Sequence, residues 1–212
     1  GRTRLVILGR PKRQLEAFGL VIASAQYRLP DAANVLKIGL PLLRPDPVRL
    51  ARAAQDWAAA LDPLPRPLVV VLVGGATRPY RLDATLVPAL LRQAAARAAP
   101  GGTIYVSTSR RTAPAVVEAL RSALPPGARL HDFASGAPNP YLALLGSGDA
   151  FIVTGDSISM LTEVARLGRP LYVQPLPLHP FWRMVVWLRR RLQAFGLFAL
   201  ERDLDAFHQW LY

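Results

Sequence analysis

The clearest pattern in the sequence is an alternation of short apolar runs with amphipathic segments. The apolar runs lie at residues 68–73, 103–107, 128–133, 150–154 and 171–174. They are continuous rather than alternately apolar and polar, as in strands that are buried on both faces of a parallel sheet. Because a helical pattern separates each run from the next, we predict an α/β domain with a doubly wound parallel sheet.

The segments between these predicted strands carry the signals of helix starts and ends. We predict helices over residues 83–99, 113–124, 140–145 and 159–167. Thr112 has a side chain suited to the N-cap of the second helix, and Asn139 followed by Pro140 suits the N-cap and first turn of the third. Gly168 is placed to end the fourth helix.

The part of the chain before residue 68 is organised differently. Three short strands are predicted at residues 4–8, 20–24 and 34–36, and two proline-rich stretches follow at 41–47 and 62–67. Residues 48–61 have helical spacing; the stripe consists of Leu50, Ala54, Trp57 and Leu61. Because proline breaks helices, we place a domain boundary within residues 41–67.

Composition limits the kinds of functional site and partner that the chain can have. The chain has no cysteine, which excludes disulfides, thiolate metal ligands and a cysteine nucleophile. Its three histidines are far apart and have no metal-binding spacing, so we expect no metal site. The 26 basic residues outnumber the 14 acidic ones, and the net charge of +12 favours polyanionic partners. No nucleic-acid-binding motif accompanies this charge, so we do not expect a nucleic-acid partner.

Two features of the sequence bear on where in the cell the protein is located. The chain shows no secretory leader and no uncharged apolar stretch of about 18 residues, which favours a cytoplasmic protein. Residues 181–195 form a basic amphipathic pattern that fits two interpretations. The helix either packs on the sheet or the other domain, or its residues Trp182–Leu192 make a peripheral contact with the inner membrane. The chain begins without methionine in a predicted strand, so we expect a piece of a longer protein.

Three of the predicted strands end in polar segments, and ligands of parallel sheets bind beyond the carboxyl ends of the strands. The first segment, residues 74–78, contains Gly74, Gly75, Thr77 and Arg78. Glycine allows backbone N–H groups to approach an anion closely, and arginine offers a fork of donors for phosphate. An ordinary turn between a strand and a helix is the alternative interpretation.

The other two segments add hydroxyl and guanidinium groups near helix starts. The second segment, residues 107–111, contributes Ser107, Ser109, Arg110 and Arg111, and the third, residues 155–163, contributes Gly155, Asp156, Ser157, Ser159 and Glu163. Helix N-termini attract phosphate, and a glutamate inside such a helix can accept both ribose hydroxyls. The alternative is helix capping with solvated arginines. Taken together, the three segments predict a site for a nucleoside diphosphate.

Several of these segments carry a resemblance to a known family. Residues 25–30 with 34–36, 73–78, 107–112, 139–141 and 149–151 with the third segment resemble the mitochondrial fission factor-like family. That family includes the plant "elongated mitochondria" protein and many bacterial relatives. The third segment with residues 168–173 also resembles the nucleotide-binding helix of GT-B glycosyltransferases, in which a glycine-rich turn meets the phosphates and a helix glutamate holds the ribose.

The resemblance implies two Rossmann-like domains with a cleft between them. Residues 1–46 would end an N-terminal domain, 47–67 would form a linker helix and proline-rich connection, 68–180 the nucleotide-binding domain, and 181–212 a C-terminal helical segment. Gln26, Tyr27 and Arg28 would lie near the cleft, where they either touch an acceptor or pack between domains. Because the catalytic base of such enzymes belongs largely to the N-terminal domain, no catalytic residue can be named.

The resemblance also implies a function. It favours a GT-B-like protein that binds a nucleotide-diphosphate sugar and transfers the sugar without a metal or another cofactor. The alternative is a non-enzymatic interaction module that acts at a membrane surface. A sugar-nucleotide epimerase would need a GxGxxG segment and a Tyr-xxx-Lys pair, and the sequence has neither.

Overall fold

The structure is a computed structural model that describes residues 4–11, 14–27, 29–179 and 184–185. Arg28 and, apart from 184–185, the predicted basic helix with Trp182–Leu192 lie outside these ranges. The chain divides into two compact units, one made of residues 44–179 and the other of residues 1–43 with 180–212. In the ranges described, no helix is long and apolar enough to cross a membrane.

The smaller unit contains the three strands predicted near the start of the chain. They are β1 (Val6–Leu8), β2 (Leu20–Ser24) and β3 (Val35–Ile38), and they pair in parallel in the order β1-β2-β3. The amide of Asn34 donates to the carbonyl oxygens of Leu15 and Phe18 at 2.7 and 2.9 Å. These two bonds tie the start of β3 to the connection between β1 and β2.

The larger unit is built on a five-stranded sheet. Its strands are β4 (Leu68–Val73), β5 (Thr103–Thr108), β6 (Arg129–His131), β7 (Ala150–Thr154) and β8 (Leu171–Gln174). All neighbours are parallel, in the order β6-β5-β4-β7-β8. All six residues of the central strand β4 are buried, as its uninterrupted apolar run predicts. The predicted parallel α/β fold is confirmed, and its architecture is Rossmann-like.

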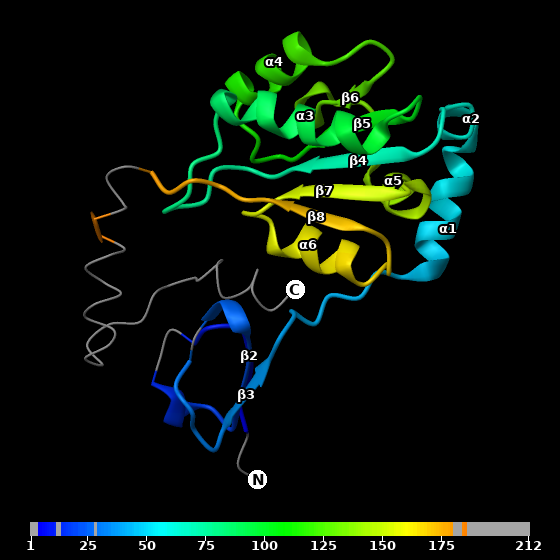
Figure 1. Ribbon diagram of the computed structural model, residues 1–212. Coiled ribbons are helices and arrows are strands. Elements are labelled where there is room, and N and C mark those ends of the chain that lie inside the picture. Colours follow the sequence, from blue (N-terminus) through cyan, green and yellow to red (C-terminus); the bar gives the residue numbers. More distant parts are fainter. Residues whose placement is uncertain (1–3, 12–13, 28, 180–183, 186–212) are drawn as a thin grey trace. The chain divides into compact units, whose positions relative to one another are not determined.

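Helices cover both faces of this sheet. The connecting helices are α3 (Val87–Ala98), α4 (Pro114–Ala123), α5 (Tyr141–Ser147) and α6 (Ile158–Ala165). On one face, Val71 and Val106 of the sheet share a buried cluster with Leu90 of α3 and Leu120 of α4. Figure 1 shows α6 on the opposite side of the sheet from α3 and α4. The sheet is therefore doubly wound.

The helix predicted over residues 48–61 is wrong in its extent, because the structure divides it in two. Helix α1 (Pro47–Asp56) ends at Trp57, whose φ and ψ of −105° and 6° interrupt the helical geometry, and α2 (Ala58–Leu61) follows. Asp46 caps α1 by accepting the N–H of Val48 at 3.0 Å. Helix α1 packs on α5 and belongs to the unit of residues 44–179. A Cβ at Gly146 of α5 would lie 2.9 Å from the Leu50 carbonyl oxygen, so glycine permits this close packing.

Two further element ends differ from the prediction. The helix predicted from residue 83 begins with a 3₁₀ turn (Ala84–Leu86) that Asp83 caps. The strand predicted over 128–133 ends at His131, because Asp132 accepts the N–H of Ala134 at 3.0 Å and starts a 3₁₀ turn (Phe133–Ser135). In both places a short-range aspartate cap overrides the apolar pattern.

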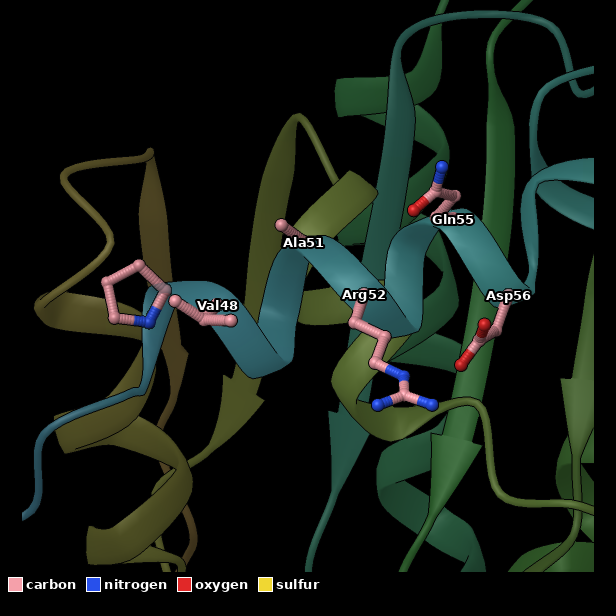
Figure 2. Close-up of a pocket in the computed structure, with 6 residues that line it drawn as sticks. Val48, Ala51, Arg52, Gln55 and Asp56 are labelled. Atoms are coloured by element: carbon pink, nitrogen blue, oxygen red, sulfur yellow. The ribbon is translucent and has the colours of Figure 1, made fainter.

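The outer side of α1 carries a shallow pocket. Figure 2 shows Val48, Ala51, Arg52, Gln55 and Asp56 along it, and all its lining residues come from this one helix. It contains none of the residues of the three polar segments. We therefore assign it no part in the predicted site.

Arg169 joins the end of α5 to the start of β8. Its guanidinium donates to the carbonyl oxygens of Leu145 at 3.3 Å, Gly146 at 2.8 Å and also Gly148. The last carbonyls of a helix have no partners within the helix. One side chain therefore satisfies the acceptors at the end of α5 and fixes the turn that precedes β7.

We expect Arg169→Ala to lower the free energy of unfolding by about 1–3 kcal/mol, because it leaves several part-buried carbonyls without a donor. Arg169→Lys should recover only part of this loss, since one ammonium group cannot reproduce the planar fork. Urea denaturation monitored by circular dichroism measures the effect. Arg52→Ala on the exposed side of α1 is the control, and an equal loss in both alanine variants would contradict the assignment.

Candidate functional site

The parallel sheet brings the three polar segments to one edge. Strands β4, β5 and β7 precede the first, second and third segments and run in the same direction, so their carboxyl ends meet at the same edge of the sheet. The strand order reverses between β4 and β7, which is the position where open parallel sheets bind ligands. The first and third segments flank this point.

The glycines of the first segment face the third segment directly. The N–H of Gly74 donates to Thr154 Oγ1 and the N–H of Gly75 donates to Asp156 Oδ2, both at 2.8 Å. A Cβ at Gly74 would lie 2.2 Å from Asp156 Oδ2, and one at Gly75 would lie 2.3 Å from the carbonyl oxygen of Arg111. Glycine allows the Asp156 carboxyl group to approach the backbone closely here. The predicted approach of a phosphate stays a prediction.

Asp156 is the centre of this arrangement. Its side chain is fully buried, and its Oδ1 accepts the hydroxyl of Thr154 at 2.7 Å. Burial raises the pKa of Asp156, because it disfavours the charged form. The Gly75 N–H, the Thr154 hydroxyl and the Arg111 guanidinium act in the opposite direction. An ionised Asp156 would repel a phosphate, so its observed role is to join segments rather than to bind an anion.

Arg111 connects all three segments. Its Nη2 lies 3.4 Å from Asp156 Oδ2 in the third segment, and its Nη1 donates to Thr77 Oγ1 in the first at 2.9 Å. The Arg111 side chain is still 49% exposed. A guanidinium carries five N–H donors, so these two contacts leave donors that face solvent.

Thr112 is not the N-cap of α4, and that prediction is wrong. The capping position is Ala113, whose side chain makes no capping bond. The Thr112 hydroxyl instead lies 2.6 Å from the carbonyl oxygen of Gly74 and 3.1 Å from that of Val73, and accepts the N–H of Ser109 at 2.9 Å. The hydroxyl turns inward because two carbonyls of the neighbouring loop need a donor.

The remaining residues of the second segment are split between the interior and the surface. Ser107 is buried within β5, opposite His131 of β6. Ser109 Oγ accepts the N–H of Arg111 at 3.2 Å and stabilises the turn. Arg110 is exposed and lines a pocket of about 450 Å³, which it shares with Ser109, Thr112, the start of α4 and Phe133. The Phe133 side chain is 40% exposed.

Glu163 lies on α6 and contacts a residue outside the three segments. The hydroxyl of Tyr141, the first residue of α5, donates to Glu163 Oε2. Burial is the largest cause of a raised Tyr141 pKa, and the bond to Glu163 raises it further, so the phenol remains a proton donor. Glu163 keeps partial exposure.

The remaining residues predicted for the site are either buried or exposed at the edge of the sheet. Ser157 is buried at the start of α6, and its carbonyl accepts the Leu161 N–H at 3.0 Å. Gly155 donates its N–H to the carbonyl oxygen of Gln174 at 2.9 Å. Arg78 and Ser159 are exposed at this edge of the sheet.

The hydrogen bonds therefore join five of the predicted residues into one network: Gly74, Gly75, Thr77, Arg111 and Asp156. Ser109 joins it through the N–H of Arg111 and through Thr112. Within the part of the chain that the structure describes, no hydrogen bond or ion pair links Arg78, Arg110, Ser159 or Glu163 to this network. Thr154 and Tyr141 were not predicted as site residues. A hydroxyl at the end of an apolar strand was the available signal for Thr154.

Gln26 and Tyr27 belong to the smaller unit. The Gln26 amide is buried and donates to Ser24 Oγ at 3.0 Å, and the Tyr27 ring lies near Gly9. Their proposed contact with an acceptor stays a prediction.

Comparison with known proteins identifies the family. The family model described as "Mitochondrial fission ELM1" matches residues 1–205. The chain belongs to the mitochondrial fission ELM1 family. This confirms the resemblance that the sequence segments indicate.

Two curated relatives match parts of the chain. The mitochondrial fission protein ELM1 of Arabidopsis thaliana is 33% identical over 128 residues, which is 60% of this chain and 30% of the relative. The uncharacterized protein RP120 of Rickettsia prowazekii (strain Madrid E) is 34% identical over 71 residues, which is 32% of this chain and 20% of that protein. The matched regions thus span less than a third of the length of either relative.

A solved structure of POFUT1 in complex with GDP also matches. It has a TM-score of 0.37 and 16% sequence identity, and the match covers 59% of this chain and 46% of that chain.

The position of Thr112 gives a test that separates a helix cap from a link between loops. Aspartate is at least as good an N-cap as threonine, so Thr112→Asp would be harmless if Thr112 capped α4. We expect it to destabilise the ELM1-family chain by about 1–3 kcal/mol, because a carboxylate would face two carbonyl oxygens. Urea denaturation measures this loss. Thr112→Ser keeps the hydroxyl and is the control, and unchanged stability in Thr112→Asp would refute the link.

The raised pKa of Asp156 gives a pH dependence with a defined sign. The folded chain holds this proton more tightly than the unfolded chain, whose pKa is near the ordinary value of 3.8. The contribution of Asp156 to the free energy of unfolding is therefore greatest below pH 3.8 and is lost as the pH rises through the raised pKa. We expect the stability of wild type relative to Asp156→Asn to fall over this range in urea denaturation. A difference that grows with pH would contradict the effect of burial.

Proposed function

We propose that this chain supplies the nucleotide-binding unit of a protein that binds a nucleoside diphosphate sugar. The ligand would lie at the carboxyl edge of the five-stranded sheet, beside the point where the strand order reverses. The observation that carries the proposal is Arg111, which contacts both Thr77 and Asp156 and remains half exposed. A guanidinium held in this way loses little conformational freedom when it binds phosphate.

Exposed arginines make this edge suitable for a diphosphate. Arg78 follows Thr77, which contacts Arg111, and Arg110 precedes Arg111 in the chain; both are exposed. Arginine forms strong bidentate hydrogen bonds to phosphate oxygens. Asp156 is buried and compensates part of the charge of Arg111, which leaves Arg78 and Arg110 as cations for the ligand. The net charge of +12 adds attraction at longer range.

Two features suit the nucleoside. The pocket between the second segment and Phe133 offers a partly exposed aromatic ring next to Arg110, and aromatic rings stack on nucleobases. Glu163 is partly exposed on α6, and a carboxylate has lone pairs enough for two hydroxyl donors.

The reaction we propose is transfer of the sugar to an acceptor. The bond between the anomeric carbon and the diphosphate oxygen breaks, so negative charge develops on the departing diphosphate. Arginines positioned at that oxygen stabilise the charge. The chain gives no assignment for the base that receives the acceptor's proton.

Titration calorimetry of the 212-residue chain with UDP, GDP, ADP and their sugar conjugates tests the proposal. We expect micromolar binding of one nucleotide. Because each lost contact is a charge-assisted hydrogen bond, Arg110→Ala and Glu163→Ala should each weaken binding by about 10- to 100-fold. Arg52→Ala removes an equally exposed arginine from α1 and should change nothing.

A second candidate is a non-enzymatic interaction module. Two observations favour it: one relative is named a mitochondrial fission protein, and the N–H groups of Gly74 and Gly75 already donate to the side chains of Thr154 and Asp156. No binding of any nucleotide by a chain shown to be folded would favour this candidate. Equal binding by wild type and both site variants would also count against the nucleotide site.

A further inference from the structure

We infer that Tyr141 is the positioning residue for ribose recognition: its phenol fixes the carboxylate of Glu163 for the vicinal hydroxyls of the ligand. The inference rests on the proposed nucleotide site and adds to it a residue from a different helix. It gives a role to the Asn139-Pro140-Tyr141 segment, which takes no other part in the proposed site.

The local structure explains why Tyr141 is well placed. It is the first residue of α5, and its N–H donates to Asn139 Oδ1 at 3.0 Å. Pro140 is buried immediately before it, and proline restricts the backbone. The backbone of Tyr141 is thus fixed by the two residues before it, so its ring has a defined direction.

The topology places Tyr141 at the same edge of the sheet as the three segments. Helix α5 follows β6 and leads into β7, and α6 follows β7. Because helices between parallel strands run back against them, both helices begin at the carboxyl edge of the sheet. Glu163 lies five residues after Ile158, the first residue of α6, which is about 7.5 Å along the helix axis.

The chemistry of the pair suits a positioning role. The Tyr141 hydroxyl donates to Glu163 Oε2, and burial together with this carboxylate keeps the pKa of the phenol above its ordinary value. The phenol therefore does not ionise at physiological pH and always offers its proton to Glu163. A carboxylate has about four acceptor sites, so the bond with Tyr141 leaves sites for two ribose hydroxyls.

A glutamate without this bond would lose more freedom on binding. Its side chain has three rotatable bonds and substantial rotamer entropy when it is unrestrained. Tyr141 removes part of that freedom before the ligand arrives, which is how preorganisation raises affinity. The effect should appear in the recognition of hydroxyl groups and not in the affinity for the diphosphate.

Binding of ribonucleotides and deoxyribonucleotides tests the inference. UDP, GDP and ADP are compared with their 2′-deoxy counterparts by titration calorimetry on wild type, Tyr141→Phe, Glu163→Gln and the double variant. We expect Tyr141→Phe to weaken ribonucleotide binding by about 3- to 10-fold, the size of one hydrogen bond. It should weaken 2′-deoxynucleotide binding less, because only the 3′-hydroxyl remains to contact Glu163, so discrimination between the two sugars falls.

The double variant shows whether Tyr141 acts through Glu163. If it does, Tyr141→Phe has no further effect in the Glu163→Gln background. Tyr172→Phe is the matched control, because Tyr172 lies on the α3 side of the sheet with Arg97 3.7 Å from its ring centroid. Circular dichroism and melting temperature check folding. Asn139→Ala, which loosens Tyr141 but keeps its hydroxyl, should give a smaller loss in the same direction.

The outcomes separate the inference from the proposed function. Ribonucleotide binding with unchanged sugar discrimination in Tyr141→Phe and Asn139→Ala overturns the inference and leaves the proposed function standing. Equal weakening of ribonucleotides and deoxyribonucleotides also overturns it, because that result indicates a general structural role. If wild type binds no nucleotide at all, the proposed function fails and the positioning role fails with it.

Discussion

The buried carboxylate of Asp156 is the interaction on which the edge of the larger sheet depends. Removing an ionised carboxylate from water is costly unless donors surround it. Here the donors are the N–H of Gly75, the guanidinium of Arg111 and the hydroxyl of Thr154, the last residue of β7. The three loops must keep their relative positions, because any that moved away would leave this charge partly unpaired.

This constraint also accounts for the small residues around it. Gly74 and Gly75 tolerate no Cβ, since Asp156 and Arg111 lie where the added carbon would be. The Thr112 hydroxyl contacts the carbonyl oxygens of Val73 and Gly74 at the same turn. The packing of the loops therefore explains why two glycines follow β4, whether or not a ligand also approaches them.

The sequence predicted the architecture well and the contacts less well. The continuous apolar run of β4 and the regular spacing of the other runs predicted the parallel sheet, because a strand buried on both faces consists mainly of apolar residues. The inward turn of Thr112 was not predictable. It depends on the carbonyls of Val73 and Gly74, which are close only in the folded chain. Likewise, the stripe on residues 48–61 indicated a helix, but no glycine or proline marks the break at Trp57 in the sequence. The strand ends indicated that the three segments lie at one edge of the sheet, but not that Thr154 accepts the N–H of Gly74 and Asp156 that of Gly75.

The two acids of the third segment have different environments, which favours a structural role for Asp156 and the proposed ligand-binding role for Glu163. Asp156 is fully buried, and its donors all belong to the three segments and Thr154, so nothing remains for a ligand. The Glu163 carboxylate is partly exposed and, among the described residues, accepts one hydrogen bond, from a phenol on another helix. An acid that is oriented on one side and accessible on the other can exchange water for ligand hydroxyls at low cost, since its main geometry is already fixed. Asp156 fixes the segments that position Arg111, whereas Glu163 is the acid that remains accessible.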